Sequence, residues 1–109
     1  MRRPLRFLAW KLQLDEAQVA EFATLLNELK TERAQAAVDD RRALTAFADA
    51  VAGETFEAAR AAEAQRLRVQ SAERLQGTIL KTIEGMHARL DPEQRARLAY
   101  LIRTGTLLL

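Results

Sequence analysis

The stretch 89-RLDPEQRARL-98 shares a five-residue pattern with 13-QLDEAQVAEF-22: leucine, aspartate, two further residues and glutamine. In each copy the aspartate carboxylate can accept hydrogen bonds from the free amides of a helix's first turn, and the glutamine three residues later can bond back to the aspartate amide. Such a capping box, with the preceding leucine as a hydrophobic staple, predicts that helices begin at Glu16 and Pro92. The residues of the two patterns are Leu14, Asp15, Gln18, Leu90, Asp91 and Gln94.

A long helix is predicted after the first pattern, because nothing between Glu16 and about Ala52 breaks a helix. Apolar residues recur there every three or four positions, which indicates one buried face. A helix of this length spans roughly 50 Å and needs a partner to cover that face. The residues of the predicted face are Val19, Phe22, Leu26, Leu29, Leu44, Phe47 and Val51, with a weaker stretch at Ala34 and Ala37.

A second long helix is predicted from roughly Phe56 to Arg89. Gly53 ends the first helix in a left-handed conformation, and Thr55 caps the second. The two arms are predicted to form an antiparallel hairpin. Gly77 and Gly85 interrupt the second arm, either as tolerated substitutions or as sites of a bend or close helix contact. Its predicted apolar positions are Phe56, Ala59, Ala62, Val69, Ala72, Leu75, Ile79, Ile83 and Met86.

The ends of the chain predict two shorter helices. Pro4 to Leu12 can form two helical turns, and the last helix runs from Pro92 to about Thr104, where Gly105 stops it. The last helix is expected to bury Leu98, Leu101 and Ile102. The predicted fold is therefore all-α, a long antiparallel helical hairpin with short N- and C-terminal helices. Two regions are predicted, a basic amphipathic segment over residues 1–13 and a hairpin domain with its closing helix over residues 14–109.

The composition limits the classes of function. The chain has 109 residues and no cysteine, which excludes disulfides and thiolate metal sites. Its net charge is +2, but residues 1–11 carry four cations and no acid, so the remainder sums to −2. This balance argues against nucleic-acid binding. No apolar run reaches the roughly 18 residues of a membrane span. An alanine-rich core is thin, so burial in a homodimer is expected.

The N-terminal stretch 2-RRPLRFLAWK-11 has two interpretations. Its cations and aromatic rings suit contact with anionic lipid headgroups at a membrane surface. It can also form a clip over the hairpin or over a dimer partner, which we favour because Leu5, Leu8 and Leu12 share one face. The side chains expected to contact a partner or lipid are Arg2, Arg3, Arg6, Phe7, Trp10 and Lys11.

With two capped helix starts on either side of a hairpin, the chain resembles the LTxxQ family of bacterial periplasmic proteins. That family includes Spy/CpxP-like chaperones and heavy-metal-resistance sensors. The resemblance covers Leu12 to Ile102 and includes 53-GETFEAAR-60, although both patterns have aspartate where the family usually has threonine. It implies a curved, cradle-like dimer in the periplasm, or anchored facing it, that holds unfolded proteins or senses stress or metals.

Enzyme chemistry and cofactors are not predicted. The sequence pairs Ser71 with no general base that could activate it as a nucleophile. The carboxylates are scattered along the predicted helix faces, and no glycine-rich loop could hold a phosphate. A transition-metal sensor centred on His87 is a third hypothesis. The carboxylates of Glu84 and Asp91 lie three and four residues from it, but a lone histidine needs further ligands.

The leading hypothesis is therefore a non-enzymatic, dimeric envelope protein that binds protein clients or a regulatory partner. Apolar groups interleaved with charges suit such reversible binding, while solvated ion pairs within each arm are the simpler explanation of the charges. A cytoplasmic helical scaffold or regulatory subunit with a coiled-coil partner is the alternative. The charged residues concerned are Arg33, Asp39, Asp40, Arg41, Arg42, Arg60, Arg66, Arg68 and Arg74.

Overall fold

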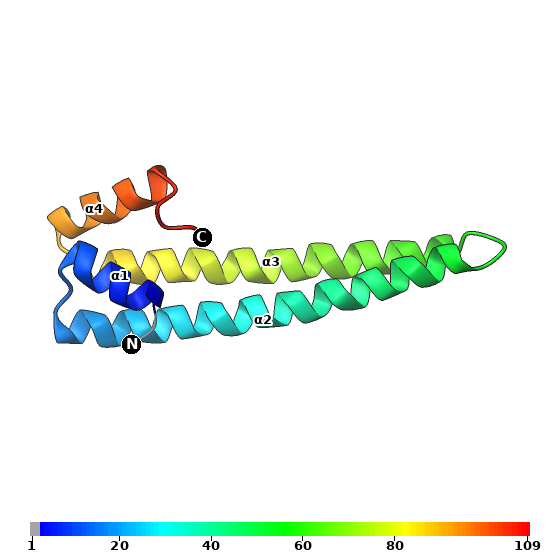
Figure 1. The fold of residues 1–109 in the computed structure, drawn as a ribbon, viewed down its shortest axis with the longest axis horizontal. Helices are drawn as coiled ribbons and strands as arrows, with labels where there is room; N and C mark the ends of the chain where they lie inside the picture. The colour runs from blue at the N-terminus through cyan, green and yellow to red at the C-terminus, as the bar shows by residue number, and fades with distance from the viewer. Residues whose placement is uncertain (1–2) are drawn as a thin grey trace. The chain divides into compact units, whose positions relative to one another are not determined.

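The computed structural model describes residues 3–109, which form four α-helices and, within that range, no strand (Figure 1). These helices are α1 (Arg3–Leu12), α2 (Glu16–Ala52), α3 (Ala58–Ala88) and α4 (Pro92–Arg103). The all-α prediction of two long and two short helices is confirmed. The helix starts predicted from the two repeated patterns are also confirmed, at Glu16 and Pro92.

The contacts divide the chain into two compact units. The first unit contains residues 3–28 and 79–109, and the second contains residues 29–78. In each unit a stretch of α2 lies beside an antiparallel stretch of α3, as the hairpin prediction requires (Figure 1). The first unit also holds α1 and α4. The division into residues 1–13 and 14–109 stays a prediction.

The core of the first unit is built from all four helices. The leucine face predicted for α1 is buried, and Leu98 and Leu101 of α4 are buried as predicted. Ile102 is exposed, so its predicted burial is wrong, because Leu98 and Leu101 already direct that face of α4 inward. Leu107 follows α4 and packs against the same core. The buried cluster consists of Leu5, Leu8, Leu12, Phe22, Met86, Leu90, Leu98 and Leu101.

The seam between α2 and α3 in the second unit is made of small residues, which differs from the prediction. Ala43 and Ala50 of α2 and Ala64 of α3 are buried there. The predicted seam residues that are instead exposed are Ala34, Ala37, Leu44, Val51, Phe56, Ala59, Ala62, Val69 and Ala72. The buried positions Phe22, Leu29, Ala43 and Ala50 lie at multiples of seven residues, with the half-buried Ala36 between them, whereas Leu44 and Val51 fall one position later, outside the seam.

The turn between α2 and α3 is wider than predicted. The helix α3 begins at Ala58, so Thr55 is not its cap, and the Glu57 carbonyl accepts the first helical hydrogen bond, from the Ala61 amide at 3.2 Å. The Glu57 amide donates to the Ala50 carbonyl at 3.0 Å and so satisfies one of the last carbonyls of α2. Gly53 therefore needs no left-handed conformation, and it does not adopt a positive φ.

A tight turn at the end of α1 leads the chain directly into the first capping box. Gln13 has a left-handed φ of 51°, its amide donates to the Trp10 carbonyl at 3.4 Å, and the Leu14 amide donates to the Ala9 carbonyl at 3.0 Å. This is the Schellman pattern, which closes a helix by satisfying its last carbonyls. Gly105, with a φ of 76°, follows α4 as predicted.

The two glycines of α3 have different surroundings, so alanine is expected to act in opposite directions at them. At Gly77 a Cβ atom meets nothing within 4 Å, and alanine should stabilise the protein by up to about 1 kcal/mol. At Gly85 a Cβ atom would lie 2.8 Å from Leu25 Cδ2, so overpacking of about 1–3 kcal/mol should outweigh the helix gain. Urea unfolding of both variants checks this, and equal stabilisation by both would contradict a close contact at Gly85.

Candidate functional site

Both predicted capping boxes are present with complete geometry. The Gln18 amide donates to Asp15 Oδ1 at 2.8 Å, and the Asp15 amide donates to Gln18 Oε1 at 3.0 Å. At α4 the Gln94 amide donates to Asp91 Oδ1 at 2.8 Å, and the Asp91 amide donates to Gln94 Oε1 at 3.1 Å. Leu90 is buried in the core and Leu14 packs against it, as expected of the residues before a cap.

The two boxes are also bonded to one another, which the sequence did not predict. Gln18 Nε2 donates to Gln94 Oε1 at 2.9 Å, and Gln94 Nε2 donates to Gln18 Oε1 at 3.1 Å. The remaining donor of Gln18 reaches the Arg89 carbonyl at 2.7 Å, and that of Gln94 reaches the Leu12 carbonyl at 3.0 Å. We call this paired arrangement the glutamine junction.

The glutamine junction joins the ends of four helices. Its oxygens accept the cap amides at the starts of α2 and α4, and its amide groups donate to carbonyls where α1 and α3 end. Every donor and acceptor of the two side-chain amides is therefore used. A glutamate could complete a capping box but has no N–H to donate. The choice of glutamine in both copies was the one available sequence signal for this junction.

A second polar cluster lies in the seam of the second unit. Asp39 of α2 is buried and accepts from Gln35 at 3.1 Å and from Arg74 of α3 at 2.8 Å. Hydrogen bonds from Gln35, Ser71 and Arg74 lower the pKa of Asp39 more than burial raises it. Arg74 also pairs with Glu32 at 3.9 Å, so this cluster fixes how α2 and α3 align.

The lowered pKa of Asp39 predicts a pH effect on stability. A carboxylate whose pKa is lower in the folded state stabilises it above the unfolded pKa of about 4, and this contribution is lost as pH falls through the folded value. Asp39→Asn should therefore unfold more easily than the wild type at pH 7, with a smaller difference at pH 3. Urea titrations at both values test this, with the exposed Glu73→Gln as the charge-matched control. An equal deficit at both pH values would contradict it.

Several charged side chains singled out in the sequence form ion pairs between α2 and α3 in the second unit, in addition to pairs within one helix. Arg60 of α3 lies 3.2 Å from Asp49 of α2, and Arg68 lies 3.8 Å from Asp40. Pairs within α3 are also present, as between Arg66 and Glu63. Exposed ion pairs contribute little stability each, about 0–1 kcal/mol, but they place charges beside apolar side chains.

An apolar stripe runs along α2 in the second unit. It consists of Leu44, Phe47 and Val51, whose spacing of three and four residues places them on one face of the helix. Leu44 is 57% exposed, Val51 is 68% exposed, and Phe47 is half-buried. The Arg68 guanidinium lies 5.7 Å from the centre of the Phe47 ring. The stripe therefore presents apolar groups next to charges that are already paired.

The N-terminal residues divide between two faces of α1. The leucine face lies in the core, and Phe7 packs against that core, so the clip prediction is confirmed within the first unit. Arg3 and Arg6 are exposed, and Trp10 is 71% exposed with Lys11 Nζ 4.7 Å from its ring centre. Arg2 lies outside the described residues. Contact of the outer face with lipid or a partner stays a prediction.

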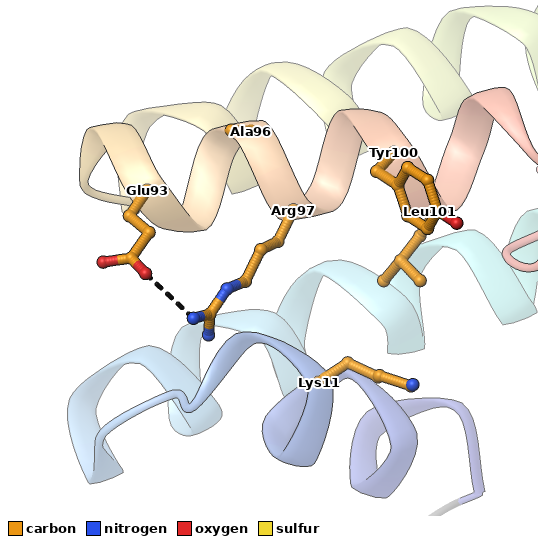
Figure 2. A pocket seen from close by; sticks show the side chains of 6 residues that line it. All are labelled: Lys11, Glu93, Ala96, Arg97, Tyr100 and Leu101. Carbon is orange, nitrogen blue, oxygen red and sulfur yellow. Dashed lines mark hydrogen bonds and ion pairs between the residues drawn. The ribbon is translucent and has the colours of Figure 1, made fainter.

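A groove of about 350 Å³ lies between α1 and α4 in the first unit. Figure 2 shows Lys11 on the α1 side and Glu93, Arg97 and Tyr100 on the α4 side, with the Glu93–Arg97 ion pair at one end. Ala96 and Leu101 also line it. The groove is open to solvent, and its lining is mostly apolar with cations at its edge.

His87 is exposed near the end of α3. Across residues 3–109, no three histidine, cysteine, aspartate or glutamate side chains lie close enough together to hold a metal ion. Glu84 and Asp91 therefore do not form the ligand set that was considered for His87. The metal-sensor hypothesis gains no site from this part of the chain.

None of the helices in the described part of the chain combines the length and the hydropathy that crossing a bilayer requires. Comparisons with protein-family models, with curated proteins and with solved structures find no match to this chain.

Proposed function

We propose that this chain is a non-enzymatic, protein-binding helical hairpin of the LTxxQ type that acts as a homodimer in the bacterial envelope. In this proposal it holds unfolded client proteins, or binds a regulatory partner, during a stress or metal-resistance response. The residues of the two repeated patterns build the scaffold, and the binding surface lies elsewhere.

The observation that carries the proposal is the uncovered apolar stripe in the second unit. Leu44 and Val51 are large apolar side chains that a helical seam would be expected to bury, yet smaller alanines occupy the seam instead. Placing the larger groups outside weakens the hairpin's own core and leaves a surface for another polypeptide. Charges such as Arg68 and Asp40 beside the stripe support contacts that form and release readily.

Two further features support the family relation. The repeated patterns are used as paired helix starts on either side of a hairpin, which is the arrangement that the resemblance implies. Both aspartates serve as helix caps, the role in which a threonine would also serve.

The proposal is tested by the aggregation of an unfolded client. Reduced, denatured lysozyme diluted into buffer scatters light as it aggregates, and the wild-type protein is expected to slow this. The double variant Leu44→Ser and Val51→Ser should lose most of this effect, because it removes the apolar groups of the stripe. Both positions are exposed, so circular dichroism should show an intact helical fold.

The matched control changes two exposed leucines outside the stripe, Leu80→Ser and Leu108→Ser, which are 66% and 82% exposed. It should hold the client as well as the wild type does. No suppression of aggregation by the wild type, or equal suppression by both double variants, would contradict client binding through the stripe.

A further inference from the structure

The groove between α1 and α4 combines an apolar floor with two cations at its edge. Ala96 and Leu101 form part of the lining, and Lys11 and Arg97 supply positive charge at the edge (Figure 2). Within these two helices the only acid is Glu93, which is paired with Arg97. An apolar group flanked by negative charge would complement this groove.

The turn between α2 and α3 has this complementary chemistry. Residues 53–57 read GETFE; of its two acids, Glu57 is paired with Arg60 at 3.1 Å, so Glu54 supplies the negative charge of the turn. The Phe56 side chain lies between Glu54 and Glu57 in the sequence and is 62% exposed. An aromatic ring left in water in this way is a large apolar group available to a partner.

We propose that the groove between α1 and α4 receives the Phe56 turn of a second copy of this chain. The Phe56 ring would cover Ala96 and Leu101 beside Tyr100, while Glu54 approaches Lys11. A lipid tail is a poorer occupant, because an open groove of this size would leave most of the tail in water. A short turn needs no enclosed cavity.

Exchange of turns between two copies gives two identical contacts related by a twofold axis, which closes a dimer. The proposal rests on the homodimer of the proposed function and names the contact that would form it. It does not depend on client binding, which the aggregation assay measures separately.

Sedimentation over a series of protein concentrations tests the contact. Phe56→Ala is expected to raise the dimer dissociation constant at least about tenfold, because an aromatic anchor is lost from its pocket. Leu80→Ala, an equally exposed apolar position outside both surfaces, should leave the dissociation constant unchanged. A monomeric wild type at about 100 μM would overturn both the homodimer and this contact. A wild-type dimer that Phe56→Ala leaves intact would overturn this contact alone.

Charge exchange tests whether the groove and the turn meet between copies. Lys11→Glu and Glu54→Lys should each weaken the dimer, because each places like charges together in both contacts. An equimolar mixture of the two variants should regain wild-type affinity: one contact then joins the two substituted side chains, and the other joins two native ones. Weak association of the mixture, with both variants folded by circular dichroism, would overturn the proposal.

Discussion

Gln94→Glu is expected to lower the free energy of unfolding by about 2–4 kcal/mol at pH 7. The glutamate could still accept the Asp91 amide and complete the box, so a simple capping role predicts almost no loss. The glutamine junction predicts a large loss, because the carboxylate cannot donate to Leu12 or to Gln18. It would also place a charge opposite two oxygens at a residue that is only 8% exposed.

Urea unfolding followed by circular dichroism measures this difference. Gln76→Glu, at an exposed position of α3, makes the same chemical change and should alter stability by less than about 0.5 kcal/mol. At low pH the difference in free energy of unfolding between Gln94→Glu and the wild type should become smaller, since a protonated carboxyl regains one hydrogen-bond donor. A deficit below 0.5 kcal/mol at pH 7 would show that the second glutamine acts only as a cap.

Leu8→Ala should lower the free energy of unfolding by about 2–5 kcal/mol. Leu8 is fully buried at 0% exposure in the core that α1 shares with Phe22 and Leu98. Truncating its side chain removes buried apolar contacts and leaves a cavity between the helices of this core, and both effects destabilise the folded state. A loss of this size, measured in buffer without lipid, would show that α1 is part of the folded unit in solution.

Trp10→Ala is the matched variant on the opposite face of the same helix. Because Trp10 is exposed, its loss should cost less than about 1 kcal/mol, including the contact with Lys11. Thermal unfolding of both variants separates the two faces of α1. If Leu8→Ala were no more harmful than Trp10→Ala, α1 would not be a clip over the core.

Helix starts were the most predictable part of this fold. A capping box is encoded by residues three positions apart, and its hydrogen bonds stay within one turn, so the sequence of 13–22 or 89–98 is sufficient to predict it. The leucine face of α1 was predictable for a similar reason, since three leucines at helical spacing have no competing face.

The seam of the second unit was not predictable by choosing the largest apolar side chains. Its position is set by the seven-residue spacing that continues from Phe22 and Leu29, and it passes through alanines. Leu44 and Val51, each one position after the buried Ala43 and Ala50, fit the helical periodicity equally well. The ion pair between the buried Asp39 and the half-exposed Arg74 belongs to the observed register, and it forms only where the two helices meet.

The candidate surfaces show the same limit. The exposed stripe on α2 could not be predicted from periodicity, because the same residues were predicted to be buried in the seam. The glutamine junction joins residues 76 positions apart, and no local pattern encodes a bond over that separation. The preference for glutamine over glutamate in both copies was the remaining trace of it.

The claim that the two repeated patterns form one junction is tested most directly by a double-mutant cycle on Gln18 and Gln94. Urea unfolding of Gln18→Ala, Gln94→Ala and the double variant measures whether their losses add. The reciprocal amide bonds predict a coupling energy of about 1 kcal/mol or more, so the double variant should lose less than the sum. Losses that add to within about 0.3 kcal/mol would show two independent caps and contradict the junction.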